Sequence, residues 1–147
     1  MDKYTIVPAP LFSEECAREL LSRLTDINNQ DEVKFIELPS HEAVLIYINT
    51  LPKIYEVIKA LDGLKDHNRV IFHYEKDVVD IAVAMDNKLL AANSYKAVDF
   101  TTALYYIFAL VNNQQINPEV TTIYSLGEIK YEEAEILFKY FKDVEQI

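Results

Sequence analysis

Few residues in this chain of 147 have the types and spacing that catalysis requires. The three histidines, His41, His67 and His73, lack the paired spacing of metal ligands, and Cys16 is the only thiol. A Ser-His-Asp set can be picked from any chain of this length, so the residue types alone give no argument for a hydrolase. We therefore predict no catalytic residues and no metal site.

Glycine is scarce, which bears directly on nucleotide binding. The chain has two glycines, Gly63 and Gly127. Phosphate-binding loops bring the backbone close to the ligand, usually through glycine. Neither Gly-x-Gly-x-x-Gly nor Gly-x-x-x-x-Gly-Lys can be formed here. The sequence therefore predicts no cofactor of the nucleotide type.

The chain is acidic, with 24 acidic and 14 basic side chains and a formal net charge of −10. Such a surface repels phosphate backbones and anionic lipids, so we expect no nucleic-acid partner. We expect no membrane insertion either, because no apolar run approaches the roughly 20 residues of a spanning helix. The acidity also keeps a protein soluble, which we favour over a specific basic partner. The N-terminus has no signal-peptide pattern, and a single cysteine fits a reducing compartment, so we predict a cytoplasmic protein.

The second half of the chain has the pattern of a mixed sheet. Three apolar segments joined by links of two or three residues predict an antiparallel meander. A nearly all-apolar helix and a further strand follow, and a strand–helix–strand link in one sheet is a right-handed crossover. An amphipathic helix carrying Ala134, Leu137, Phe138 and Phe141 precedes a last short strand, parallel to the previous one. The expected ranges are strands 69–74, 78–84 and 88–92, helix 99–111, and strands 120–126 and 144–147.

The first half reads as a smaller α+β lobe. Ser13 is expected to cap a helix whose buried face carries Ala17, Leu20, Leu21 and Leu24, with Cys16 as a small buried side chain beside it. The expected strands are 4–7, 33–38 and 43–48, the last of them central because it is continuously apolar. A helix beginning near Thr50 is expected to end at Gly63. A polar stretch at 64–68 predicts two lobes, residues 1–65 and residues 66–147.

Four stretches of this chain read YTIVPAPLFSEECARELL, VDIAVAMDNKLLAANSY, DFTTALYYIFAL and TTIYSLGEI. Together they resemble an uncharacterised bacterial domain family in the actin-like ATPase, or ribonuclease H-like, superfamily. The family is distantly similar to actin relatives of pilus assembly and cell division. The resemblance implies an α/β fold, a ribonuclease H-like mixed sheet with flanking helices beside the smaller α+β lobe. It also implies another module before residues 4–11, which would make this chain a C-terminal portion or a shortened member.

The departures from that superfamily concern the residues that hold phosphate. The resemblance places the Asp-x-Gly of the first hairpin at His73-Tyr74-Glu75, where both the aspartate and the glycine are missing. The double glycine that contacts adenosine has its counterpart at residues 125–128, with Gly127 alone. A ribonuclease H-type nuclease would need a carboxylate inside strand 69–74, which has none. We therefore expect no nucleotide hydrolysis, since phosphoryl transfer depends on these parts.

Our leading hypothesis is a non-catalytic, degenerate actin-like domain that acts through contacts with a protein partner or with itself. The candidate interface residues are Tyr105 and Tyr106, together with the outer strand of the meander. The alternative is a cryptic nucleotide or small-ligand binder that uses a cleft between the lobes near Tyr74, Asp80 and Gly127. Asp80 either faces that cleft or marks a solvated face, and we favour the solvated face. A third hypothesis is a purely structural oligomerisation module.

Overall fold

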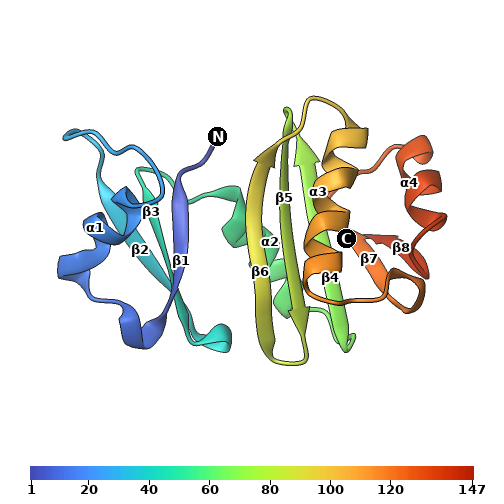
Figure 1. The fold of residues 1–147 in the computed structure, drawn as a ribbon, viewed down its shortest axis with the longest axis horizontal. Coiled ribbons are helices and arrows are strands. Elements are labelled where there is room, and N and C mark those ends of the chain that lie inside the picture. Colours follow the sequence, from blue (N-terminus) through green and yellow to red (C-terminus); the bar gives the residue numbers. More distant parts are fainter. The chain divides into compact units, whose positions relative to one another are not determined.

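The computed structural model describes all 147 residues, which form two compact units (Figure 1). One unit comprises residues 2–55, and the other comprises residues 56–147 together with Met1. Helix α2 (Lys53–Asp62) contains the boundary between them. The predicted division into 1–65 and 66–147 stays a prediction. No helix has the length and apolar character needed to cross a membrane.

The first unit is a three-stranded antiparallel sheet with one short helix. Its strands lie in the order β1-β3-β2, so the apolar strand β3 is central, as predicted. Helix α1 covers the sheet through Ala17 and Leu21, which pack against Val44 and Ile46. The elements are β1 (Tyr4–Pro8), 3-10 turns Ala9–Leu11 and Glu14–Cys16, α1 (Ala17–Ser22), β2 (Val33–Leu38), the 3-10 turn Pro39–His41 and β3 (Ala43–Ile48).

Two predictions about the first helix are wrong, and one is confirmed. The Ser13 side chain accepts a hydrogen bond from the Cys16 backbone N–H, so the predicted cap is present. Because that first turn is a 3-10 turn, the buried stripe shifts, and Cys16 is exposed instead of buried. The helix ends at Ser22, which leaves Leu24 70% exposed.

The second unit is a five-stranded mixed sheet in the order β6-β5-β4-β7-β8. Strands β4, β5 and β6 form the predicted antiparallel meander. Strand β7 is parallel to β4, and β8 is parallel to β7, as the two crossovers require. The elements are β4 (Asn68–Glu75), β5 (Val78–Met85), β6 (Lys88–Lys96), α3 (Phe100–Asn113), the 3-10 turn Pro118–Val120, β7 (Thr122–Ser125), α4 (Tyr131–Phe138) and β8 (Asp143–Gln146).

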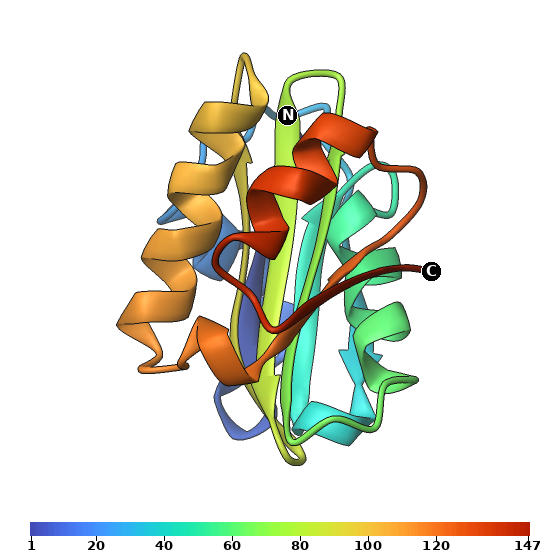
Figure 2. The ribbon, with the colours of Figure 1, turned by 90° about the vertical axis from the view of Figure 1, so that its right-hand side faces the viewer.

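The core of this unit lies between the sheet and two helices. Figure 2 shows α3 and α4 on the same face of the sheet. Alternate residues of the central strands point to them, including Val70 and Phe72 of β4, and they meet Ile107 of α3 and Leu137 of α4. Arg69 points to the other face, where its guanidinium donates to the carbonyl oxygen of Leu61 near the end of α2. The sheet is therefore packed on both faces.

Three of the differences between predicted and observed boundaries bear on the packing. Strand β6 continues to Lys96 instead of ending at Ala92, because an outermost strand can carry polar residues such as Asn93. Strand β7 begins at Thr122, because Pro118 starts a 3-10 turn. Helix α4 ends at Phe138, whose side chain is 52% exposed and does not join the predicted buried face.

Candidate functional site

A pocket of about 400 Å³ lies at the ends of two neighbouring parallel strands, β4 and β7. Tyr74 comes from the end of β4, and Glu128, Ile129 and Lys130 come from the link between β7 and α4. Glu133, in the first turn of α4, completes the lining. Open α/β sheets bind ligands at the carboxyl ends of their strands, so this position makes the pocket a candidate site.

Tyr74 is fixed by its neighbours. Its hydroxyl donates to the carbonyl oxygen of Ala97 at 2.8 Å, and its ring centroid lies 6.0 Å from that of Phe100. Burial raises the pKa of Tyr74, and the negative charges of Asp77, Asp99 and Glu133 raise it further. The tyrosine therefore stays neutral and reports an acidic surrounding.

The link that contains Gly127 offers almost no free backbone N–H groups. Four of the five backbone N–H groups of residues 126–130 donate within the protein. Gly127 itself has φ +87° and donates to the C-terminal residue. The acceptors, in chain order, are the carbonyl oxygens of Phe72 and Ile147 and the side-chain oxygens of Gln146 and Glu133. A phosphate cradle needs unpaired N–H groups, so this link does not provide one.

The hairpin between β4 and β5 has a two-residue turn, the shortest common hairpin connection. Lys76 and Asp77 have φ values of +52° and +61°, which are those of a two-residue turn with two left-handed positions. Strand pairing continues up to Glu75 and Val78. The segment His73-Tyr74-Glu75, which stands where the resemblance places Asp-x-Gly, is therefore paired strand and not an open loop.

Negative charge dominates this end of the unit. Glu128 and Glu133 line the pocket against one cation, Lys130. Asp99 caps α3, where its carboxylate accepts from the Thr102 backbone N–H at 2.8 Å and the Thr102 hydroxyl at 2.7 Å. The backbone hydrogen bond is the main cause that lowers the pKa of Asp99, so its charge is held at the N-terminus of α3. An anionic ligand would meet repulsion here.

The structure does not bring Asp80 together with Tyr74 and Gly127. Asp80 pairs across the strands with His73 and Ser94, on the face opposite Tyr74. The predicted solvated face is wrong, since Asp80 is 3% exposed. The Ser94 hydroxyl donates to Asp80 Oδ1 at 2.5 Å, and His73 Nδ1 lies 3.7 Å from Oδ2. The Asp80 carboxylate lies between Ser94 and His73, so these three side chains lack the Ser-His contact of a nucleophilic triad.

A cluster of three tyrosines joins the two predicted interface elements, and we call it the tyrosine cluster. Tyr106 of α3 stacks on Tyr95 of β6, with ring centroids 4.2 Å apart and planes 3° apart. Tyr105 meets Tyr106 edge-on at 5.4 Å and is 68% exposed. β6 is the outermost strand of its sheet. The sequence predicted Tyr105 and Tyr106 but not Tyr95, because the third strand was expected to end before it.

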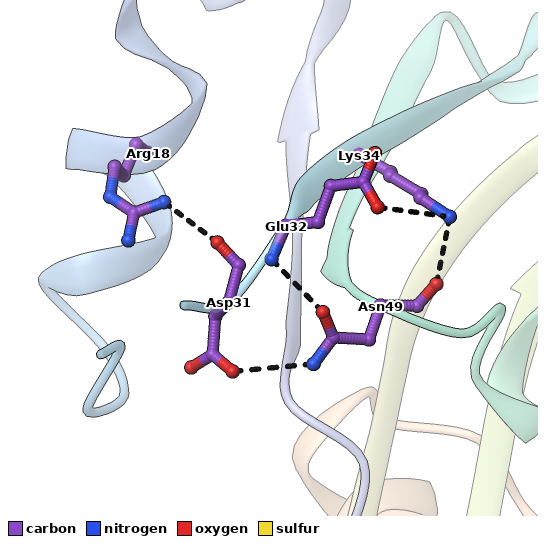
Figure 3. Close-up of polar contacts among 5 residues, drawn as sticks. All are labelled: Arg18, Asp31, Glu32, Lys34 and Asn49. Atoms are coloured by element: carbon purple, nitrogen blue, oxygen red, sulfur yellow. Dashed lines mark hydrogen bonds and ion pairs between the residues drawn. The ribbon is translucent and has the colours of Figure 1, made fainter. Parts of the chain in front are cut away.

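A polar network in the first unit was also missed (Figure 3). Asn49, with φ +61°, accepts from the Glu32 backbone N–H and donates to Asp31 Oδ1 at 3.2 Å. The Arg18 guanidinium donates to the carbonyl oxygen of Asp31, and the Lys34 ammonium donates to that of Asn49. A hydrogen bond from the Asn28 backbone is the main cause that lowers the pKa of Asp31. These contacts tie a loop to the ends of β2 and β3, which is a structural role.

Comparison with known proteins supplies a family and a fold. A family described as "Protein of unknown function (DUF3822)" matches residues 1–61 and 49–144. A Bacteroides thetaiotaomicron crystal structure, described as a protein with actin-like ATPase fold and unknown function, superposes with a TM-score of 0.81 at 21% identity. The match covers all of this chain and 65% of that one.

Two further results add nothing to the fold. Archaeoglobus fulgidus Pelota matches 71% of this chain and 34% of its own, with 10% identity and a TM-score of 0.38, which carries no argument. None of the curated proteins matches the chain. The sheet order, the flanking helices and the family match lead to one conclusion: the chain belongs to the DUF3822 family of proteins of unknown function and has an actin-like ATPase fold.

Proposed function

We propose that this chain is a non-catalytic, degenerate actin-like domain that acts through protein–protein contacts. The observation that carries the proposal is the tyrosine cluster on an uncharged helix. No charged residue occurs from Phe100 to Pro118, in a chain of which 26% is charged. Tyrosines that are wholly or partly accessible beside an uncharged helix are typical of interface centres, where charged residues are depleted.

The geometry of the cluster suits an anchor. The stack of Tyr106 on Tyr95 fixes two rings against the sheet, so they lose little freedom on binding. Tyr105 stands beside them with most of its surface exposed, and a partner would cover it. A second copy of this chain can also approach here, because this helix adds no charge to the mutual repulsion of two acidic chains.

We call the domain degenerate for two reasons. The backbone N–H groups beside Gly127 already donate hydrogen bonds within the protein, and the β4–β5 hairpin has a two-residue turn instead of an open loop. Phosphoryl transfer depends on positioning and charge stabilisation of the phosphates, and these segments leave no cradle for them. The single cysteine and the bacterial source of the solved relative support a bacterial cytoplasmic protein as part of the same proposal.

Site-specific photo-crosslinking tests the proposal. A benzoylphenylalanine at position 105 of the full chain, in the native host, is expected to give one discrete adduct on illumination. The same residue at Leu24, which is 70% exposed in the first unit, is the matched control and is expected to give none. Mass spectrometry identifies the adduct, and the purified partner, or a second copy, must reproduce it in vitro. Equal yields at both positions, or no adduct from position 105, would refute the proposal.

The second candidate is a cryptic binder of a nucleotide or small ligand, and it is supported only by the size of the pocket beside Tyr74, since the acidic lining disfavours phosphate. The pocket's volume of about 400 Å³ is enough for such a group. A thermal shift with one nucleotide that is lost in Gly127→Arg would support this candidate over a protein-contact domain.

A further inference from the structure

We propose that the pocket formed by Tyr74, Glu128, Ile129, Lys130 and Glu133 receives a basic side chain, the guanidinium of an arginine or the ammonium of a lysine, from a partner protein. We call it the acidic pocket. The inference rests on the proposed function in one respect, that the partner is a protein. It uses a different surface from the tyrosine cluster.

Charge inside the acidic pocket favours a cation. Glu128 lines the pocket and is exposed, so a cation can reach its carboxylate. One carboxylate oxygen of Glu133 accepts a hydrogen bond from the Lys130 backbone N–H at 3.2 Å, which leaves the other oxygen for a ligand. Asp77 and Asp99 stand close enough to act on Tyr74 as negative charges. The lining thus sets two carboxylates, those of Glu128 and Glu133, against a single ammonium, that of Lys130.

The features that usually attract anions at this place are already occupied. The N-terminus of α3 is capped by the Asp99 carboxylate, and the start of α4 is met by that of Glu133. Each helix dipole therefore has its own negative charge and gives no net attraction to phosphate. The backbone N–H groups of residues 126, 127, 129 and 130 are also in use. The pocket at the strand ends is thus present without the means of holding a phosphate.

The walls suit the stem of a long basic side chain. Tyr74 and Ile129 provide apolar surface, along which the methylene groups of arginine or lysine pack while the charged end reaches the carboxylates. An arginine also pairs two parallel N–H groups with a carboxylate such as that of Glu128. The volume of about 400 Å³ is large enough for such a side chain.

NMR titration of the full ¹⁵N-labelled chain at low salt tests the inference. The probe is N-acetyl-arginine methylamide, with N-acetyl-glutamate methylamide, spermidine and ATP with magnesium as comparisons. The arginine probe is expected to shift the amides of Tyr74 and of residues 127–133. The double variant Glu128→Gln, Glu133→Gln is expected to lower its affinity about five- to tenfold, because glutamine keeps the cap to Lys130 and removes the charges.

Matched variants separate a site from general acidity. Glu119→Gln with Glu145→Gln removes the same charge from an exposed turn and an exposed strand residue outside the pocket, and is expected to leave the affinity unchanged. Lys130→Gln is expected to tighten binding of the arginine probe about two- to fivefold, because it removes the only cation of the lining.

Four results would overturn the inference. The first is the absence of chemical-shift changes with the arginine probe at concentrations up to about 50 mM. The second is an equal loss of affinity for that probe in the pocket variant and the control variant. The third is larger shifts of the same amides with ATP, and the fourth is binding of spermidine about tenfold tighter than that of the arginine probe. The last would assign the pocket to a free polyamine. The crosslink from position 105 is independent of all of them, so the failure of one proposal can be told from the failure of the other.

Discussion

Replacing Gly127 by alanine tests whether this glycine serves a turn or a ligand. Its φ of +87° lies in the left-handed region, and an added Cβ would meet no atom within 4 Å. The cost is therefore backbone strain without a clash, about 1–2 kcal/mol. The hydrogen bond from its N–H to Ile147 remains possible, so nothing else changes.

The other glycine is the matched control. Gly63 does not have a left-handed φ, and an added Cβ would lie 3.4 Å from the Ala60 carbonyl oxygen, an ordinary contact. Gly63→Ala is therefore expected to stabilise the protein by about 0.4–1 kcal/mol, because alanine lowers the entropy of the unfolded chain. The two variants should then differ by about 1.5–3 kcal/mol, the sum of the two effects.

Urea unfolding followed by circular dichroism measures both variants, and the slope against urea should not change. The melting temperature of Gly127→Ala should fall by about 3–8 °C, with a rise in Gly63→Ala. If Gly127→Ala is as stable as the parent, the link does not hold its left-handed turn. The claim that its backbone N–H groups are used within the fold would then fail.

Three further predictions concern buried polar groups. Arg69→Met should cost about 1.5–3 kcal/mol in urea unfolding, because the buried guanidinium donates to carbonyl oxygens at the end of α2; a loss below about 0.5 kcal/mol would contradict this role. Ser94→Ala should cost about 1–3 kcal/mol, because it removes the hydrogen bond to the buried Asp80 carboxylate, and an unchanged urea midpoint would count against it. Burial and the hydrogen bond to Asp66 raise the pKa of Tyr124 to about 12, so its contribution to stability is complete below about pH 10 and is lost as the pH rises toward 12. Tyr124→Phe should remove that slope, and a phenol absorbance titration without a late-ionising tyrosine would refute it.

Periodic elements could be predicted from the sequence because apolar spacing determines them. The meander, the all-apolar helix α3 and the central strand β3 have strong patterns, and all three are confirmed. The sheet order rests on the short links and on the resemblance to the actin-like superfamily, and the solved relative confirms the fold.

The errors fall where tertiary context overrides local pattern. Asp80 is buried because Ser94, on a strand whose end was predicted too early, supplies a hydrogen bond that sequence spacing does not reveal. Cys16 is exposed because a 3-10 turn rotates the helix face. For the candidate site, Tyr74 and the neighbours of Gly127 meet at the pocket, but its glutamates were not predicted, since no local signal places them on one wall.

We expect this actin-like fold to have no place for a triphosphate, and the proposed non-catalytic function depends on this point. Isothermal titration of the full chain with ATP and magnesium, with released phosphate measured in the same samples, tests it directly. The occupied N–H groups and the acidic lining predict no binding heat in the micromolar range and no phosphate release. Micromolar binding accompanied by turnover would contradict the account.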